Sequence, residues 1–145
     1  HTISPASFKE VQGFRKIVEI GAGEAILATI PDNDLDHLEA VNNRILESRN
    51  VTEAAEADYA FHDALVNCAG NSVLLSSFRF QKQAMLDIMR LGKEARFINE
   101  ETHRDHKSII DALKNRDRIA YAYLLSRHLE YGMRFVAADR ARQEA

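Results

Sequence analysis

The sequence contains one cysteine, two prolines and no tryptophan among its 145 residues. The single cysteine, Cys68, excludes a disulfide within the chain and is typical of proteins from a reducing compartment, so we expect a cytoplasmic location. Both prolines, Pro5 and Pro31, lie near the amino end, and no helix-breaking proline follows them. Glycine is sparse, whereas alanine, leucine, glutamate and arginine are plentiful. This composition predicts an all-α fold.

The sequence also lacks an excess of positive charge and any long hydrophobic run. The net charge is -3 at pH 7, which argues against binding of this segment itself to the phosphate backbone of nucleic acids. No apolar stretch approaches the ~20 residues that span a bilayer, so we expect no membrane partner. The chain begins at His1 without a methionine, and we interpret it as a piece of a longer protein. We expect residues 1–6 to be a linker remnant and residues 7–145 to be one helical domain.

Apolar residues recur at helical spacing in several segments, which predicts an antiparallel bundle of six to seven helices. The predicted helices run from a cap at Ser7 to about Thr29, from a cap at Asp32, Asn33 or Asp34 to about Asn50, from Thr52 to Gly70, from Ser72 to Gly92, from about Glu94 to Lys114, and from about Arg118 to near Arg140. Gly21 and Gly23 each cost a helix interior roughly 1 kcal/mol relative to alanine. We therefore expect a neighbouring helix to approach closely there.

Two polar residues of the third predicted helix point the same way. Asp58 and His62 are four residues apart, so their side chains lie one above the other on a helix. Both sit on or beside the apolar stripe that includes Phe61 and Leu65. A carboxylate that faces a core is costly unless something compensates it. A metal ion bound by the aspartate and the histidine would supply that compensation.

His106 and His128 fall in the middle of the apolar stripes of the last two predicted helices. Each is 11 residues from Asp117, which lies in the short break between these helices. In an antiparallel pair of helices, equal distances of ~16 Å along each axis bring the two histidines to the same level. The bundle would then hold four inward side chains of metal-ligand type: Asp58, His62, His106 and His128.

This donor set suits a divalent ion, with zinc first and nickel, cobalt or manganese as alternatives. Water or a ligand oxygen would complete five or six coordination positions. The competing interpretation makes each residue a core histidine that is hydrogen-bonded to a carbonyl group. His1 and His37 have no converging partners, so we expect them at the surface. His103 is expected at the surface too, with support of the metal site as the alternative.

These residues resemble the effector-binding (FCD) domain of bacterial transcription regulators of the GntR superfamily, FadR subgroup. The resemblance rests on Asp58-x-x-x-His62 with Phe61 and then Ala69-Gly70-Asn71, on His106-x-x-Ile109 with Ala112-Leu113, Asp117, Ala120 and His128, and on Phe14-Arg15 with Glu19. It extends from about residue 8 to residue 140. The resemblance implies a helical bundle that binds a divalent metal through the same four side chains, with a small carboxylate-bearing metabolite against the metal.

The resemblance also implies partners. Relatives carry a winged helix-turn-helix before this domain, which is absent from this chain, so operator DNA would be bound only through that missing part. Relatives form homodimers, and the effector alters how the paired DNA-binding domains sit on DNA. We therefore expect a domain of a transcription regulator rather than an enzyme, with a small organic-acid or sugar-acid effector.

Arg15 and Asn71 are the residues that we expect to contact the effector. Arginine offers a bidentate fork to a carboxylate, and the first helix would line the cavity. The alternative for Arg15 is a surface ion pair with Glu19 one turn later, worth only ~0.3–0.5 kcal/mol. Asn71 follows the third helix directly, and capping of the next helix explains it equally well.

Two other functions compete with effector sensing. A metal with an open position can activate water, so a metal-dependent hydrolase is one alternative. The sequence has no His-Glu-x-x-His motif, and it has a single Glu-x-x-His pair, Glu100 with His103, where a di-metal carboxylate bundle needs two. The other alternative is a dimerisation module in which the metal is purely structural.

Overall fold

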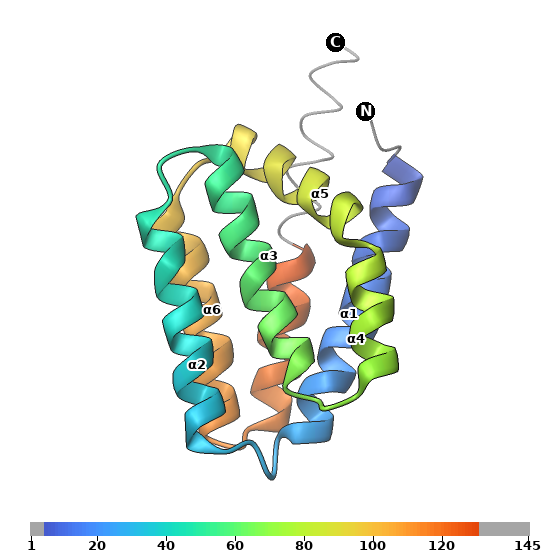
Figure 1. The fold of residues 1–145 in the computed structure, drawn as a ribbon, viewed down its shortest axis with the longest axis vertical. Coiled ribbons are helices and arrows are strands. Elements are labelled where there is room, and N and C mark those ends of the chain that lie inside the picture. The colour runs from blue at the N-terminus through green and yellow to red at the C-terminus, as the bar shows by residue number, and fades with distance from the viewer. Residues whose placement is uncertain (1–4, 131–145) are drawn as a thin grey trace.

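The computed structural model of the chain describes residues 5–130, which form an all-α bundle (Figure 1). The elements are α1 (Pro5–Ile26), α2 (Asp32–Asn43), the 3-10 helix η1 (Arg44–Glu47), α3 (Val51–Asn67), α4 (Ser72–Phe80), α5 (Lys82–Ala95) and α6 (Asn99–Lys114), followed by a helix over residues 118–130. The prediction of an all-α bundle is confirmed. No helix in this described part is long and apolar enough to cross a membrane.

Helix α3 lies in the middle of the bundle, between α2 and α6 on one side and α1, α4 and α5 on the other (Figure 1). Its residues Phe61 and Leu65 belong to a core cluster shared with α2, α6 and the helix 118–130. Its residues Tyr59 and Val66 belong to a second cluster, shared with α1, α4 and α5. Because α3 is covered on both sides, Asp58 and His62 are buried although they are polar, whereas Glu56 lies on the uncovered face and is exposed.

Several predicted helix ends are wrong. Helix α1 starts at Pro5 and ends at Ile26, so Ser7 lies inside it rather than at its cap. Pro31 precedes α2 with no side-chain cap bond, and the last predicted turns of this segment form η1. The Pro31 backbone is extended, and its carbonyl oxygen accepts hydrogen bonds from the amides of Asp34 and Leu35, so α2 begins directly after Pro31. Helix α3 begins at Val51 because the Asn50 side chain accepts a hydrogen bond from the Glu53 amide.

The fourth and fifth predicted helices also differ from the structure. The fourth is divided at Gln81, where the backbone turns so that Phe78 of α4 and Met85 of α5 can both reach the same core cluster. The fifth begins at Asn99 rather than near Glu94, because the preceding residue Ile98 is extended and exposed. The break between α6 and the last described helix is confirmed. Residues 131–140 of the sixth predicted helix lie outside the described residues.

Close helix approach is confirmed at Gly23. A Cβ atom at this position would lie 2.0 Å from the Cζ atom of Tyr121, which comes from the helix 118–130. The Tyr121 hydroxyl donates a hydrogen bond to the Glu19 carbonyl oxygen, at 2.6 Å. At Gly21 the expectation is wrong, because an added Cβ would meet nothing within 4 Å. The contact at Gly23 joins α1 to the last described helix one turn from the buried polar residues described next.

Candidate metal centre

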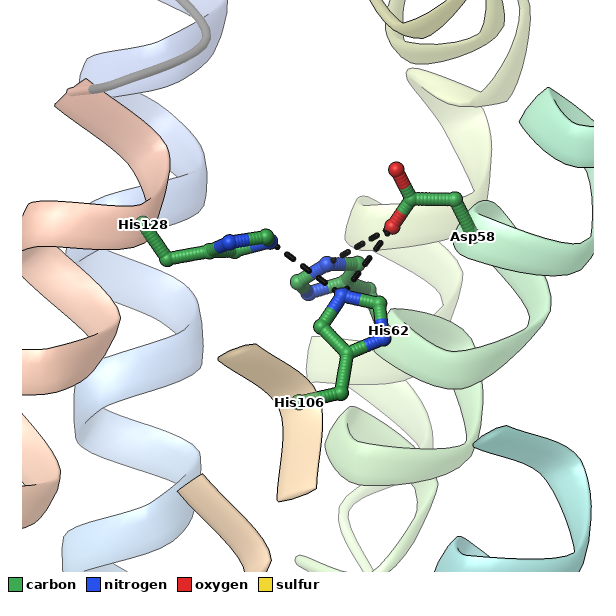
Figure 2. Close-up of side chains that lie close together, drawn as sticks. All are labelled: Asp58, His62, His106 and His128. Carbon is green, nitrogen blue, oxygen red and sulfur yellow. Dashed lines mark hydrogen bonds and ion pairs between the residues drawn. The ribbon is translucent and has the colours of Figure 1, made fainter. Parts of the chain in front are cut away.

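Four side chains converge in the interior of the bundle (Figure 2). Asp58 and His62 come from α3, His106 from α6 and His128 from the helix 118–130, and each offers a ligand atom within 4.8 Å of all the others. The His106 Nε2 atom lies 3.2 Å from Asp58 Oδ1 and 3.2 Å from His128 Nε2. The predicted alignment of His106 with His128 across the antiparallel pair is therefore confirmed.

Each of the three imidazoles is held from behind through its Nδ1 atom. The Nδ1 atom of His62 contacts the Glu19 carboxylate, that of His106 lies 3.0 Å from Asn42 Oδ1, and that of His128 lies 3.3 Å from Asp105 Oδ2. In all three cases the Nε2 atom is left to face the centre of the cluster. An outer acceptor on one ring nitrogen fixes the tautomer and orients the other nitrogen as a ligand.

The orientation of the Asn42 amide is itself determined by the structure. The Asn42 Nδ2 atom donates to the His103 carbonyl oxygen at 2.9 Å, so its Oδ1 atom must face His106 and accept. The Phe61 ring stacks on the His106 ring with centroids 4.0 Å apart and an interplanar angle of 8°. The His106 ring is therefore restrained both in its plane and in its tautomer.

The electrostatics of the site keep ligand atoms available. Burial alone would raise the pKa of Asp58, but the positive charge of Lys93 and the neighbouring imidazoles hold it well below its usual value. The Lys93 Nζ atom contacts Asp58 Oδ2 at 2.7 Å, which leaves Oδ1 for the centre of the cluster. Burial lowers the pKa of His106 to about 3, so this imidazole is neutral at physiological pH. A neutral imidazole and an ionised carboxylate are the forms that bind metals.

The cluster fits a metal ion better than it fits a hydrogen-bonded core. Asp58 Oδ1 and His62 Nε2 are buried and lie 3.2 Å apart, but neither atom makes a hydrogen bond of good geometry with any of the described residues. The Nδ1 atoms of His106 and His128 already face outer acceptors, so the two Nε2 atoms, which face each other at 3.2 Å, are left as ligand atoms. Bonds of ~2.0–2.2 Å to zinc place neighbouring ligand atoms roughly 3.0–3.5 Å apart. The buried cluster could therefore hold a metal ion, whose identity the donor atoms alone do not determine.

A cavity of about 100 Å³ lies beside this cluster. Its lining includes Arg15, Asp58, Lys93 and His128, together with apolar side chains of α5 such as Met89. Arg15 is buried, and its Nη2 atom has no hydrogen-bond partner among residues 5–130. The surface alternative for Arg15 is therefore wrong, although the ion pair with Glu19 exists and is itself buried.

Three other residues considered from the sequence do not line the cavity: Asn71, His37 and His103. Asn71 is exposed, and its side chain accepts a hydrogen bond from the Leu74 amide at the start of α4, as the capping alternative expects. His37 is exposed, as expected. His103 is half-buried, and its ring contacts Asn43, while its carbonyl oxygen holds the Asn42 amide. His1 lies outside the described residues.

Sequence reasoning missed Glu19 as a buried residue, and it missed Asn42, Asp105 and Lys93. Three of these positions carried a signal. Glu19 lies three residues before Ala22 and seven before Ile26 on the buried face of α1, and Asn42 lies between the buried residues Leu38 of α2 and Ile45 of η1. Lys93 follows Met89 by four residues on the buried face of α5, whereas Asp105 is exposed and its contact with His128 could not be found from periodicity.

The geometry can be compared with known proteins. Residues 10–131 match the model of the FCD domain family, and the chain belongs to this family. No curated protein matches the sequence. The family match and the buried cluster together indicate an effector-binding regulatory domain with a possible metal site.

Proposed function

We propose that this chain is the effector-sensing domain of a metabolite-responsive transcription regulator of the GntR superfamily, FadR subgroup. The observation that carries the proposal is the convergence of Asp58, His62, His106 and His128 beside a cavity lined by Arg15, whose buried Nη2 atom has no hydrogen-bond partner among residues 5–130. Membership in the FCD family supports the regulatory role. DNA binding would belong to a winged helix-turn-helix domain that is not part of this chain.

The metal in this proposal is a divalent ion, with zinc preferred for a donor set of three imidazoles and one carboxylate, and nickel, cobalt or manganese as alternatives. Asp58 would bind through Oδ1, because Lys93 holds Oδ2, and each histidine through Nε2. When bound, the ion would supply a positive centre to which an oxyanion can attach.

The effector in this proposal is a small organic acid or a sugar acid. The cavity volume of about 100 Å³ favours a small organic acid. Charge balance favours an anion. The charged side chains at the site and in the cavity lining are three cations, Arg15, Lys93 and Arg96, and four anions, Glu19, Asp58, Glu101 and Asp105. A divalent ion would therefore leave one uncompensated positive charge. A carboxylate would offset that charge and give the Arg15 Nη2 atom a partner.

Regulation would follow if the anion prefers one of two arrangements of a homodimer, because a ligand shifts an equilibrium only by its difference in affinity for the two states. Helix α1 would transmit the change, because its Arg15 lines the cavity and its Glu19 contacts His62. We expect the isolated domain to sediment as a dimer at micromolar concentration. A strictly monomeric species would count against this part of the proposal.

A thermal-shift screen of organic and sugar acids tests the proposal. The wild-type domain is loaded with zinc or treated with chelator, and Arg15→Met is compared with Arg104→Met, which alters an exposed arginine of α6. A true effector should stabilise the loaded wild type and Arg104→Met by roughly 2.7 kcal/mol at a hundredfold excess over Kd. It should stabilise neither the chelated protein nor Arg15→Met. A hit that survives both changes, or a library without any hit, would contradict the proposal.

A further inference from the structure

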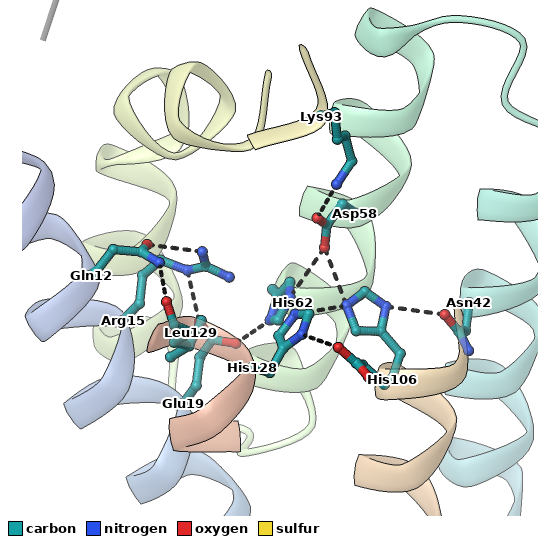
Figure 3. A network of polar contacts seen from close by, with 11 residues as sticks. Gln12, Arg15, Glu19, Asn42, Asp58, His62, Lys93, His106, His128 and Leu129 are labelled. Carbon is teal, nitrogen blue, oxygen red and sulfur yellow. Dashed lines mark hydrogen bonds and ion pairs between the residues drawn. The ribbon is translucent and has the colours of Figure 1, made fainter. Parts of the chain in front are cut away.

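Glu19 is fully buried and lies between His62 of the metal cluster and Arg15, which lines the cavity (Figure 3). Its Oε1 atom contacts His62 Nδ1, and its Oε2 atom accepts a hydrogen bond from Arg15 Nε at 3.0 Å. One carboxylate therefore holds a candidate metal ligand with one oxygen and the cavity arginine with the other. The contact with Arg15 is not needed to hold His62, because the Oε1 atom of Glu19 already does so.

The orientation of Arg15 is built by several contacts. Its Nη1 atom donates to Gln12 Oε1 at 3.0 Å, and Gln12 Nε2 donates in turn to the Leu129 carbonyl oxygen at 3.0 Å. Glu19 holds the Nε atom and Gln12 holds the Nη1 atom, so Nη2 is left without a hydrogen-bond partner among residues 5–130, on a side chain that is 4% exposed. An unpaired buried guanidinium nitrogen is costly unless a ligand satisfies it.

We propose that Glu19 is a positioning residue that couples metal binding at His62 to anion binding at an Arg15 subsite in the cavity. The proposal rests on the proposed function, which gives the Arg15 Nη2 atom a carboxylate partner, and it adds Glu19 as the link between that partner and the metal. The charge and the acceptors of Glu19 are shared between His62 and Arg15. Metal and anion affinities should therefore depend on each other, and any such coupling is reciprocal.

The chemistry of a carboxylate makes this proposal sharply testable. His62 Nδ1–H and Arg15 Nε–H are both donors, so the group between them must accept on both sides. Glutamine has the same length but only one acceptor oxygen. In Glu19→Gln, an amide that accepts from Arg15 turns its NH₂ group toward His62 and favours the tautomer that blocks Nε2. An amide that accepts from His62 turns its NH₂ group toward Arg15 and displaces it.

The experiment uses Co²⁺ as the metal, followed by its visible spectrum, and acetate as the anion, with sodium chloride at equal ionic strength as the reference. In the wild type, acetate should lower the apparent Kd for Co²⁺. Glu19→Gln should either raise the Kd for Co²⁺ by roughly 10–100-fold or lose the acetate effect. Glu24→Gln is the matched control, because it makes the same change on the exposed side of α1, where Glu24 pairs with Arg118. It should leave both quantities unchanged.

Arg15→Met provides a second variant in case Glu19→Gln fails to fold. It should bind Co²⁺ no more weakly than the wild type and should lose the acetate effect. The coupling is overturned if Glu19→Gln keeps both wild-type quantities, or if Arg15→Met keeps the acetate effect. A wild type that binds no Co²⁺ would instead contradict the proposed metal function. A wild type that binds Co²⁺ with no acetate effect would contradict the carboxylate ligand class and the coupling together.

Discussion

At the scale of single residues, the site is organised by what lies behind each histidine. Glu19, Asn42 and Asp105 each accept from one Nδ1 atom, so three Nε2 atoms converge with Asp58 Oδ1 (Figure 3). The helical spacing of Asp58 and His62 and the symmetry about Asp117 were enough to predict the four converging side chains. Spacing alone places Glu19 and Asn42 on buried helix faces, but the histidine that each contacts was not predictable, because it depends on which helices are neighbours in space.

Asn42 gives the first prediction at this scale. Asn42→Leu removes the acceptor that fixes the tautomer of His106, so the affinity for zinc should fall by roughly 10–100-fold. The adjacent Asn43→Leu is the matched control, since Asn43 is exposed and its side chain contacts the ring of His103 rather than that of His106. Competition titration with a chromophoric chelator measures both affinities. Equal affinities for the two variants would contradict the role of Asn42.

The pH dependence of metal binding gives the second prediction. Burial lowers the pKa of His62, but the carboxylates of Glu19 and Asp58 together outweigh this effect, so the net shift of the pKa is upward from 6.5. A proton on His62 competes with the metal. As pH falls through this raised pKa, metal affinity should decrease, and the decrease should begin above pH 6.5, where an ordinary histidine is still neutral. Zinc titrations across the neutral range measure this onset. Constant affinity down to pH 6 would contradict the account.

At the scale of helices, periodicity predicted which segments are helical better than where they end. The apolar stripes of α3 and α6 are correct in type and in their buried face, because burial itself sets that pattern. The division at Gln81 was missed because no proline or glycine marks it. The turn exists so that α4 and α5 can both cover α3, which is a property of packing rather than of local sequence.

The two glycines of α1 give the prediction at this scale. Gly23→Ala places a Cβ atom 2.0 Å from the rigid Tyr121 ring, and such overpacking should destabilise the fold by about 1–3 kcal/mol. Gly21→Ala meets nothing within 4 Å and should stabilise the helix by about 0.5–1 kcal/mol. Urea unfolding of the metal-free proteins measures both changes. Two variants of equal stability would show that the contact between α1 and Tyr121 does not constrain the bundle.

At the scale of the whole molecule, the metal cluster joins elements that are far apart in the sequence. Its ligands come from α3, α6 and the helix 118–130, and α1 and α2 supply the acceptors behind two of them. A bound ion would therefore cross-link most of the bundle, and the cavity beside it would be formed only when these helices are in place. In the proposed function, binding at this one small site would therefore affect several helices of the domain at once.

Metal content tests this account most directly. Wild-type protein, purified without a nickel column, should contain about one divalent ion per chain by mass spectrometry. His106→Ala and His128→Ala should lose most of it, while His37→Ala, which alters an exposed histidine of α2, should retain it. Full metal content in both His106→Ala and His128→Ala, or none in the wild type after incubation with zinc, would contradict the assignment of this cluster as a metal site.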